Sequence, residues 1–167
     1  MAPVTKNLRD GELMLRDGDD PVNSQLLALD EGNLQFNVPD PKEQILDRGT
    51  LSHLREGDEQ PVTGSFAVKF TELYNQGSND ITPYEAFKQL NGAADWVSTN
   101  SDGGGVYTIE MRFTVRSPTS GESDERITFA KTYAKSIDFQ ENNPSMLTVN
   151  FVDFETAPTV LKVAEGS

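Results

Sequence analysis

The sequence predicts a mostly β protein, a β-sandwich or partial barrel with one short flanking α-helix and long extended hairpins. Three observations predict it. Apolar and polar side chains alternate strictly in several segments, as in strands with one buried and one solvated face. Clusters of Gly, Pro, Asn and Asp separate these segments. Only one segment carries the capping signals of a helix.

The chain has 167 residues, which suits a single domain. Residues 1–10 are polar and precede the first alternating segment, so we expect them to form an N-terminal arm. Residues 11–155 are expected to form one β-rich domain, and residues 156–167 a C-terminal tail.

The first strand is expected at residues 12–16, with Leu13 and Leu15 facing inward. Residues 17–23, "DGDDPVN", have the composition of a turn. Two short strands are expected on either side of the pair Glu31-Gly32. The charged stretch 55–61, "REGDEQP", is expected to be a loop between two extended segments.

Residues 82–92, "TPYEAFKQLNG", predict the one clear helix. Thr82 is the expected N-cap, Pro83 suits the first helical position, and Glu85 completes the spacing of a capping box. Gly92 stands where a helix commonly ends. We expect Phe87 and Leu90 to share the face that packs on a sheet.

The segment 106–116 alternates without a break and predicts a strand of about 36 Å. A compact domain of this length has a diameter of only about 40 Å. A second extended segment, 126–140, follows the polar loop 117–125. We therefore expect a long hairpin that extends beyond its own core and pairs with a neighbouring subunit.

The second segment has small residues at even positions, namely Thr128, Ala130, Thr132, Ala134 and Ser136. Its odd positions are apolar but are interrupted by Lys131 and Lys135. Such lysines are typical of an edge strand that resists aggregation. The other interpretation is that this part of the strand leaves its own core and pairs with another copy.

Composition excludes several classes of function. The net charge of −13 repels nucleic-acid phosphates, so sequence-specific nucleic-acid binding is not expected; the acidity serves solubility, or faces something negative that must not adhere. There is no cysteine and hence no disulfide or thiolate site. No apolar run approaches the length of a membrane span, and the N-terminus lacks a signal-peptide pattern, so we expect no membrane anchor and folding in the cytoplasm.

Nothing in the sequence points to catalysis. The one histidine, His53, lies beside a charged stretch, and no triad can be assembled around it. The run Asp17–Asp20 lacks the spacing of a calcium loop and is better explained as an Asp-rich turn. We therefore expect no enzyme, no cofactor and no metal site.

The segment 47–74, "DRGTLSHLREGDEQPVTGSFAVKFTELY", resembles a stretch of the tail tube proteins of long-tailed bacteriophages. In that family a strand ending in an Arg-Gly turn leads through a charged loop to a strand of the type P-x-x-G-S-F. The stretches "LRDGELMLRDGDDPVN" and "AKSIDFQENNPSMLTVNFVDFE" are similar to the family's opening and closing strands.

The resemblance implies a structural virion protein of the phage tail. Such subunits self-assemble as hexameric rings, the rings stack into a tube, and DNA passes through without specific binding during ejection. It also implies tape measure and terminator proteins as partners, assembly in the host cytoplasm, and loops with an N-terminal arm that lock ring to ring.

A channel for DNA should have a wall that is small, polar and net acidic. We expect that wall to include the following residues: Thr108, Glu110, Arg112, Thr128, Thr132 and Ser136. The arginines Arg112 and Arg116 are expected to pair with Glu110 or with acids of a neighbouring strand. Contacts between subunits are expected at these positions: Arg48, Leu54, Arg55, Glu56, Asp58, Lys131, Tyr133 and Lys135. The loop 54–61 and the arm 1–9 are expected to become ordered only on assembly.

Two other classes remain open. A tail terminator or capsid decoration protein would share the β-rich character but would form a single ring or a trimer. A small carbohydrate- or peptide-binding β-sandwich would require clustered exposed aromatic residues, and the chain has only one Trp and four Tyr.

Overall fold

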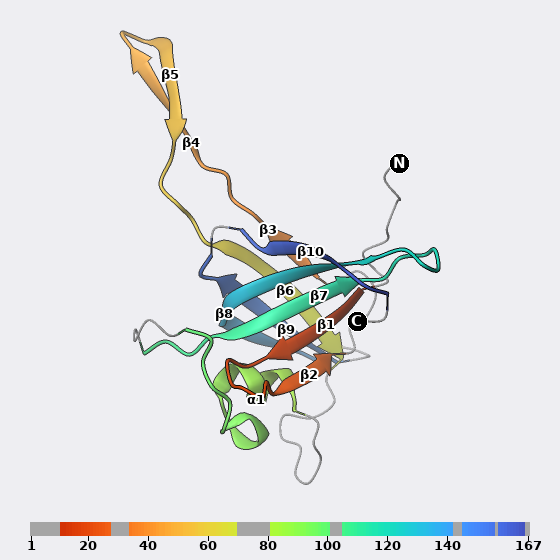
Figure 1. Cartoon of the computed structure of the whole chain (residues 1–167). Helices are drawn as coiled ribbons and strands as arrows, with labels where there is room; N and C mark the ends of the chain where they lie inside the picture. Colours follow the sequence, from red (N-terminus) through yellow and green to blue (C-terminus); the bar gives the residue numbers. More distant parts are fainter. Residues whose placement is uncertain are drawn as a thin grey trace.

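The structure is a computed structural model that describes residues 11–27, 34–69, 81–100, 105–141, 145–155 and 157–165. It is mostly β, with one short α-helix, as the sequence predicts. Eight strands form one antiparallel sheet: β1 Gly11–Arg16, β2 Ser24–Leu27, β3 Gln35–Asn37, β6 Val62–Lys69, β7 Ile109–Val115, β8 Asp124–Gln140, β9 Met146–Asp153 and β10 Thr159–Val163. Two further strands, β4 Lys42–Asp47 and β5 Thr50–Glu56, form a separate hairpin (Figure 1).

The strand order of the sheet is β2-β1-β7-β8-β9-β6-β3, with β10 beside β8. Among the described residues β2 and β3 pair on one side only, so the sheet is open and does not close into a barrel.

The 17-residue strand β8 belongs to both halves of the sheet. Its first part, up to Thr132, pairs with β7 on one side and β10 on the other, whereas its last part, from Thr132, pairs with β9. We call β2, β1, β7, β10 and the first part of β8 the first half-sheet. The second half-sheet consists of the last part of β8 with β9, β6 and β3. In Figure 1 the two halves cross in front of and behind one another.

The core lies between the two half-sheets. One continuous cluster of buried residues joins Leu15 and Met111 of the first half to Phe66 and Val149 of the second. Three aromatic rings bridge the halves: Phe129 of β8 lies 5.2 Å from Phe36 and 5.5 Å from Phe151, both edge-on. The expected inward position of Leu13 and Leu15 is confirmed, since both are fully buried.

The strand expected at 106–116 is shorter than its alternation suggested. β7 begins at Ile109, and Thr108 before it is buried and bonded to Thr99 through their hydroxyl groups at 2.8 Å. β7 is paired along its whole length by β1 and β8. It therefore presents no unpaired backbone edge, and the expectation that this strand pairs with a neighbouring subunit is wrong.

The second long strand is present at nearly the expected bounds, but its small residues do not form one face. Phe129 and Thr132 are both fully buried, although their odd and even positions would place them on opposite faces of a regular strand. Irregular registers lie between Ile109 and Met111 opposite β8 and between Ala134 and Ser136 within it. Each irregularity changes which parity faces the core.

The helix is shorter than expected. α1 spans Pro83–Lys88, with Thr82 as N-cap and a complete capping box to Glu85, as the sequence predicts. Gln89 adopts the left-handed conformation and ends the helix three residues before Gly92. Leu90 therefore lies beyond the helix and is 43 % exposed, whereas Phe87 is buried as expected. A short 3-10 helix, η2 Asn91–Ala93, follows.

Two boundaries also differ. The expected C-terminal tail contains β10, which pairs with β8 from Thr159↔Thr128 to Val163↔Asp124. The charged stretch expected as a loop begins later, because Arg55 and Glu56 are the last residues of β5. The N-terminal arm, residues 1–10, and the expected strand around Leu29 lie outside the described residues.

Candidate assembly surfaces

The β4–β5 hairpin projects away from the sheet (Figure 1). Every residue from Lys42 to Glu56 is exposed, and the two strands pair only with each other. Arg48 and Gly49 both have positive φ, 50° and 82°, which is typical of a tight two-residue hairpin turn. At the base, the Gly57 N–H donates to the Pro41 carbonyl at 2.9 Å, so the chain leaves and re-enters the body at one point.

Three leucines share one face of this hairpin. The register pairs Gln44 with Leu54 and Ile45 with His53, then shifts so that Leu46 pairs with Leu51. The extra residue on β5 places Leu51 on the same side as Leu54, although alternation alone would separate them. We call Leu46, Leu51 and Leu54 the leucine face; they are 59 %, 59 % and 64 % exposed.

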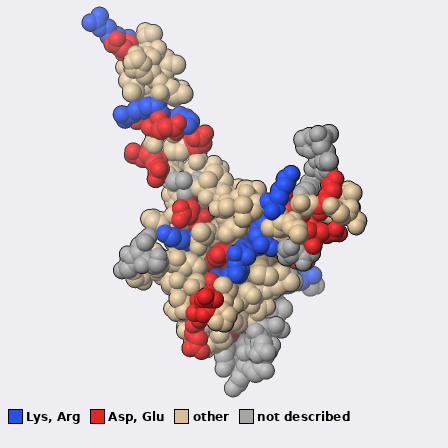
Figure 2. Space-filling view, viewed as in Figure 1, with Lys and Arg blue, Asp and Glu red and all other residues tan. Residues whose placement is uncertain are grey.

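The hairpin is electrically neutral. Residues 42–56 contain three Lys or Arg and three Asp or Glu, so the whole net charge of −13 lies in the rest of the chain. Lys42 pairs with Glu56 at 2.6 Å, and Arg55 pairs with Glu43. These pairs form the belt of charge at the hairpin base in Figure 2, with uncharged side chains between that belt and the charged tip.

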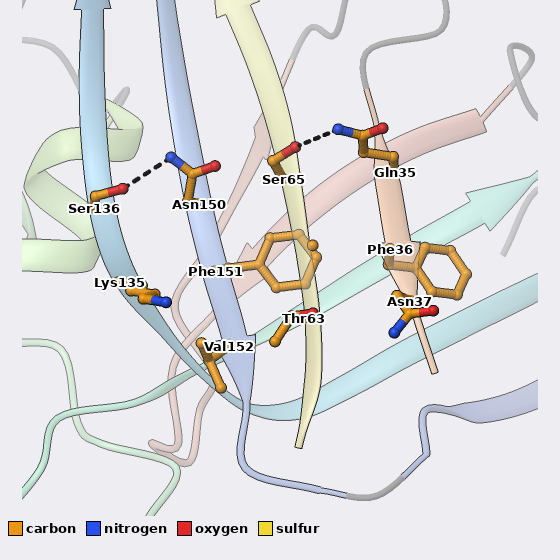
Figure 3. Close-up of a pocket in the computed structure, with 11 residues that line it drawn as sticks. Gln35, Phe36, Asn37, Thr63, Ser65, Lys135, Ser136, Asn150, Phe151 and Val152 are labelled. Atoms are coloured by element: carbon orange, nitrogen blue, oxygen red, sulfur yellow. Dashed lines mark hydrogen bonds between the residues drawn. The ribbon is translucent and has the colours of Figure 1, made fainter. Parts of the chain in front are cut away.

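A shallow groove of about 540 Å³ lies on the outer face of the second half-sheet. Four polar side chains form a row across its strands, because the register aligns Gln35 with Ser65, Ser65 with Asn150, and Asn150 with Ser136. Gln35 donates to Ser65 at 3.1 Å, and Asn150 donates to Ser136 at 2.8 Å (Figure 3). We call this surface the polar groove.

Uncharged groups dominate the polar groove. Its lining residues include a single ionisable side chain, Lys135. The carboxylate of Asp138 lies at the margin of the groove, where it accepts a hydrogen bond from the lining residue Asn150 at 2.7 Å. Two hydrogen bonds thus join the four residues of the row in pairs, and none of the four side chains carries a charge. Such a surface can face a polyanion without holding it or repelling it strongly.

The outer face of the first half-sheet is charged and internally paired. Glu110 accepts from Arg16 at 3.1 Å and also pairs with Arg112. Arg116 pairs with both Glu12 and Asp124 at 2.9 Å. These pairings confirm the expected partners of Arg112 and Arg116, and Figure 2 shows the basic groups gathered over these strands.

The six residues expected to line a channel do not share one surface. Thr108 and Thr132 are buried and cannot face a channel, so these two predictions are wrong. Glu110, Arg112 and Thr128 lie on the outer face of the first half-sheet, where the register aligns Arg112 with Thr128. Ser136 alone lies in the polar groove. The division follows from the bend in β8, which places its two ends in different half-sheets.

The residues expected at contacts between subunits fall into two groups. Arg48 lies at the hairpin tip, Leu54, Arg55 and Glu56 lie in β5, and Asp58 lies in the exposed loop that follows. The other group, Lys131, Tyr133 and Lys135, lies on β8, where Lys131 pairs with Glu155 at 3.9 Å. Beyond Thr132 no described strand pairs with β8 on the side away from β9.

The Asp-rich turn is held by its first carboxylate. Asp17 is buried and accepts from Asn23 N at 2.8 Å, Asn23 Nδ2 at 2.7 Å, Val97 N at 3.3 Å and Asp19 N at 3.4 Å. Burial acts to raise its pKa, but these donors outweigh it and the pKa lies below the ordinary 3.8. The carboxylate thus ties the turn to the segment after η2.

Within the described ranges no group of three His, Asp or Glu side chains is placed to hold a metal ion. His53 is an exposed residue of β5 opposite Ile45. None of the described helices is long and apolar enough to cross a membrane.

Sequence reasoning missed most of the two surfaces that the fold creates. Leu46 and Leu51 carry a signal, since they flank the Arg-Gly turn, but their common face depends on a bulge. Gln35, Ser65 and Asn150 come from three strands distant in sequence, and no local pattern joins them.

Comparisons with known proteins bear on the fold alone. No protein-family model matches the chain, and no curated protein matches it. A solved structure of the SPP1 tail tube, determined by solid-state NMR and cryo-electron microscopy, is similar with a TM-score of 0.50 and 10 % identity. The match covers 98 % of this chain and 80 % of that chain. The chain therefore has a tail-tube-like fold.

Proposed function

We propose that this protein is a structural subunit of a bacteriophage tail, a tail tube protein that self-assembles into stacked hexameric rings around a channel for DNA. The fold likeness, which extends over nearly the whole chain, supports the proposal. It acts by assembly and not by catalysis. Tape measure and terminator proteins would be its partners in the virion tail.

The observation that carries the proposal is the projecting hairpin. Its 15 residues pair only with each other, so in a monomer only that pairing and two exposed ion pairs offset the cost of ordering them. Nothing in the described part of the chain covers the three exposed leucines. A neutral apolar projection on a chain of charge −13 is the part that a second copy can approach with least repulsion. A contact with another copy accounts for both features.

The second half-sheet offers the elements of a ring. Its two edges, β3 and the part of β8 beyond Thr132, have no further strand partner in the described part of the chain. Joining these edges between copies would continue one sheet around a closed circle, which removes the exposed edges. In this arrangement the polar groove is the channel wall, and of the six residues expected from the sequence it keeps Ser136 alone.

The chemistry of the polar groove suits the passage of DNA. Gln35, Ser65, Asn150 and Ser136 carry no charge, and the amides of Gln35 and Asn150 already donate to Ser65 and Ser136, so the row would hold phosphates only weakly. The wall would be nearly neutral, with Lys135 and Asp138 as its charges, and the acidic groups elsewhere on each subunit would supply a weak repulsion.

Electron microscopy of the purified protein tests the proposal. The intact chain should form tubes with a regular repeat along the axis. A variant with residues 42–56 replaced by a short Gly-Ser link should keep its fold, because Pro41 and Gly57 already lie in hydrogen-bond contact. It should form no long tubes. Circular dichroism and a thermal melt of both proteins provide the control for folding.

Other outcomes separate the remaining classes. Single closed rings from the intact chain would favour a terminator, and trimers would favour a capsid decoration protein. Monodisperse monomers at all protein concentrations would contradict the proposal.

A further inference from the structure

We propose that the crossing of β8 between the two half-sheets is a pH-sensitive hinge, closed while the Asp153 carboxyl group is neutral and loosened when it ionises. The inference concerns a single chain and does not depend on the proposed function. It assigns a role to a buried carboxyl group that none of the assembly surfaces uses.

One row of residues joins the two half-sheets. Thr132 of β8 pairs with Ile109 of β7 on one side and with Asp153 of β9 on the other. Asp153 in turn pairs with Val62 of β6. All four residues are fully buried. The sheet is continuous from one half to the other along this row, so a change in the angle between the halves must act on it.

The strand pairing is irregular on either side of this row. Between Phe129 and Thr132, β8 has one residue more than the segment of β7 opposite it. Between Ala134 and Ser136, it has one residue more than β9. Extra residues of this kind bend a strand and increase its twist. The bend of β8 thus lies within residues 129–136, where the regular ladder is interrupted twice.

The Asp153 side chain holds the first of these two bulges. The N–H of Lys131 lies in the bulge and donates to Asp153 Oδ1 at 3.0 Å. The carbonyl of Lys131 accepts from the Phe154 N–H at 2.8 Å. The end of β9 therefore fixes Lys131 through two hydrogen bonds, and one of them depends on the carboxyl group.

The other oxygen of this carboxyl group, Oδ2, is buried and has no hydrogen-bond partner among the described residues. A neutral carboxyl group can occupy such a position at modest cost, but an ionised one lacks the donors that its charge requires. Water would supply them, and it can reach Oδ2 only if the chain around Asp153 moves away from β8. Ionisation therefore favours a local opening of the junction.

Burial raises the pKa of Asp153 to about 6, so both forms occur at moderate pH. Two charged residues act on it: Lys131 opposes the shift through its N–H and its charge, whereas Glu155 adds to the shift. These two residues pair with each other at 3.9 Å. β6 and β7 bring Val62 and Ile109 to the row, which cannot ionise, and β10 begins with an uncharged residue. The hinge is thus closed below pH 6 and loosened above it.

The hinge sets the angle between two surfaces of the molecule. The charged outer face of the first half-sheet, with Arg112 and Thr128, lies on one side of the bend. The polar groove, with Ser136 and Asn150, lies on the other side. A change within residues 129–136 can turn one surface relative to the other while both half-sheets stay folded.

Hydrogen exchange of single amides tests the hinge. The chain is kept below the concentration at which it assembles, and the protection factors of the Lys131 and Phe113 amides are compared at pH 4.5 and pH 7.5. Phe113 is the reference because it lies in β7 with a partner on either side, Leu13 and Ile127. From the lower to the higher pH, the protection of Lys131 should fall at least tenfold more than that of Phe113.

Two variants assign this effect to the charge of Asp153. Asp153→Asn removes the charge and keeps an oxygen that can accept from Lys131, so the ratio of the two protection factors should be the same at both pH values. Glu155→Gln keeps the Asp153 carboxyl group and should retain the pH dependence, with its midpoint moved to lower pH.

Equal losses of protection at Lys131 and Phe113 would overturn the inference, because the charge would then weaken the whole fold. A pH dependence that persists in Asp153→Asn would overturn it as well. Where that variant fails to fold, NMR of the Asp153 carboxyl carbon in the wild type replaces it. The titration midpoint of this carbon should coincide with that of the Lys131 protection, and midpoints one pH unit or more apart would contradict the hinge.

A distance measurement tests whether the half-sheets turn. Spin labels at Thr148→Cys in β9 and Leu161→Cys in β10 lie on different half-sheets, and the chain has no cysteine of its own. Their distance distribution should be broader at pH 7.5 than at pH 4.5, and equal at both in the Asp153→Asn background. The control pair Leu26→Cys and Leu161→Cys places both labels on exposed residues of the first half-sheet and should not respond to pH. An unchanged distribution for the first pair would overturn the inference.

Discussion

The backbone N–H of Lys131 donates to Asp153 Oδ1 at 3.0 Å, while the other carboxylate oxygen of Asp153 has no hydrogen-bond partner. Asp153 is fully buried where β9 ends, opposite Thr132 of β8 and Val62 of β6. This hydrogen bond lies at the point where β8 passes from one half-sheet to the other.

We expect Asp153→Asn to stabilise the protein at neutral pH. Burial raises the pKa of Asp153 to about 6, with Glu155 adding to the shift and the Lys131 N–H opposing it. The folded state holds the proton more tightly than the unfolded chain, so this stabilisation is present below pH 3.8 and is lost as the pH rises through 6. At about 1.4 kcal/mol per pKa unit, the ionised group costs about 3 kcal/mol at pH 7.5.

Chemical denaturation of the wild type and Asp153→Asn at pH 4 to 8 measures this effect. The variant should gain about 1–3 kcal/mol at pH 7.5 and show a flatter profile between pH 4 and 6.5. The control is Glu155→Gln. Glu155 is exposed and acts on Asp153 only through its charge, so this substitution should change the pH profile far less. A loss of stability in Asp153→Asn at pH 7.5 would show that the ionised carboxylate is required.

Asp17→Asn should destabilise the protein at neutral pH, in contrast to Asp153→Asn. The pKa of Asp17 is lowered because its hydrogen bonds outweigh burial, so its contribution is present above the unfolded value and is lost as the pH falls below it. The asparagine side chain would place its own NH2 group against the N–H groups that donate to Asp17, so at least one of these hydrogen bonds would be lost. We expect a loss of about 1–3 kcal/mol at pH 7. Unchanged stability in the same denaturation assay would be evidence against this anchor.

Gly64→Ala should weaken the pairing of β3 with β6. A Cβ at this position would lie 2.4 Å from the Gln35 carbonyl oxygen and 2.6 Å from the Phe151 ring. We expect a loss of about 1–3 kcal/mol in a thermal melt. Ser65→Ala on the same strand serves as control, since it removes only the bond from Gln35 and should cost about 1 kcal/mol. A neutral Gly64→Ala would mean that β3 moves aside readily.

The polar groove should become inaccessible on assembly if it is the channel wall. Thr148→Cys, on the same side of β9 as Asn150, should react with a bulky polyethylene glycol maleimide at least tenfold more slowly in tubes than in monomers. Leu161→Cys, 53 % exposed on β10, should react at similar rates in both. Equal rates for Thr148→Cys in the two states would place the channel wall elsewhere.

The loop 57–61 and the hairpin before it should gain protection from hydrogen exchange on assembly. Their residues are almost all exposed in the single chain, so only a second copy can exclude water from them. Exchange followed by mass spectrometry in monomers and tubes measures this. Equal protection in both states would speak against a role of this region in assembly.

Local chemistry in the sequence determined the elements themselves. The alternation of Ile109, Met111, Phe113 and Val115 specifies a strand with one buried face, because successive side chains point to opposite sides. Thr82, Pro83 and Glu85 specify the start of α1, because the capping box needs only residues three apart. The end of the helix was not determined locally: Gln89 takes the left-handed conformation in place of the expected glycine.

Only the tertiary structure decided which residues share a surface. The bend of β8 buried Thr132 and divided Thr128 from Ser136, although all three have the same parity. A bulge placed Leu51 beside Leu54, and strand pairing aligned Gln35 with Asn150 across β6. The physical reason is that alternation fixes a side chain relative to its own neighbours, whereas bulges and pairing between distant strands set which faces meet the core, the solvent or another copy.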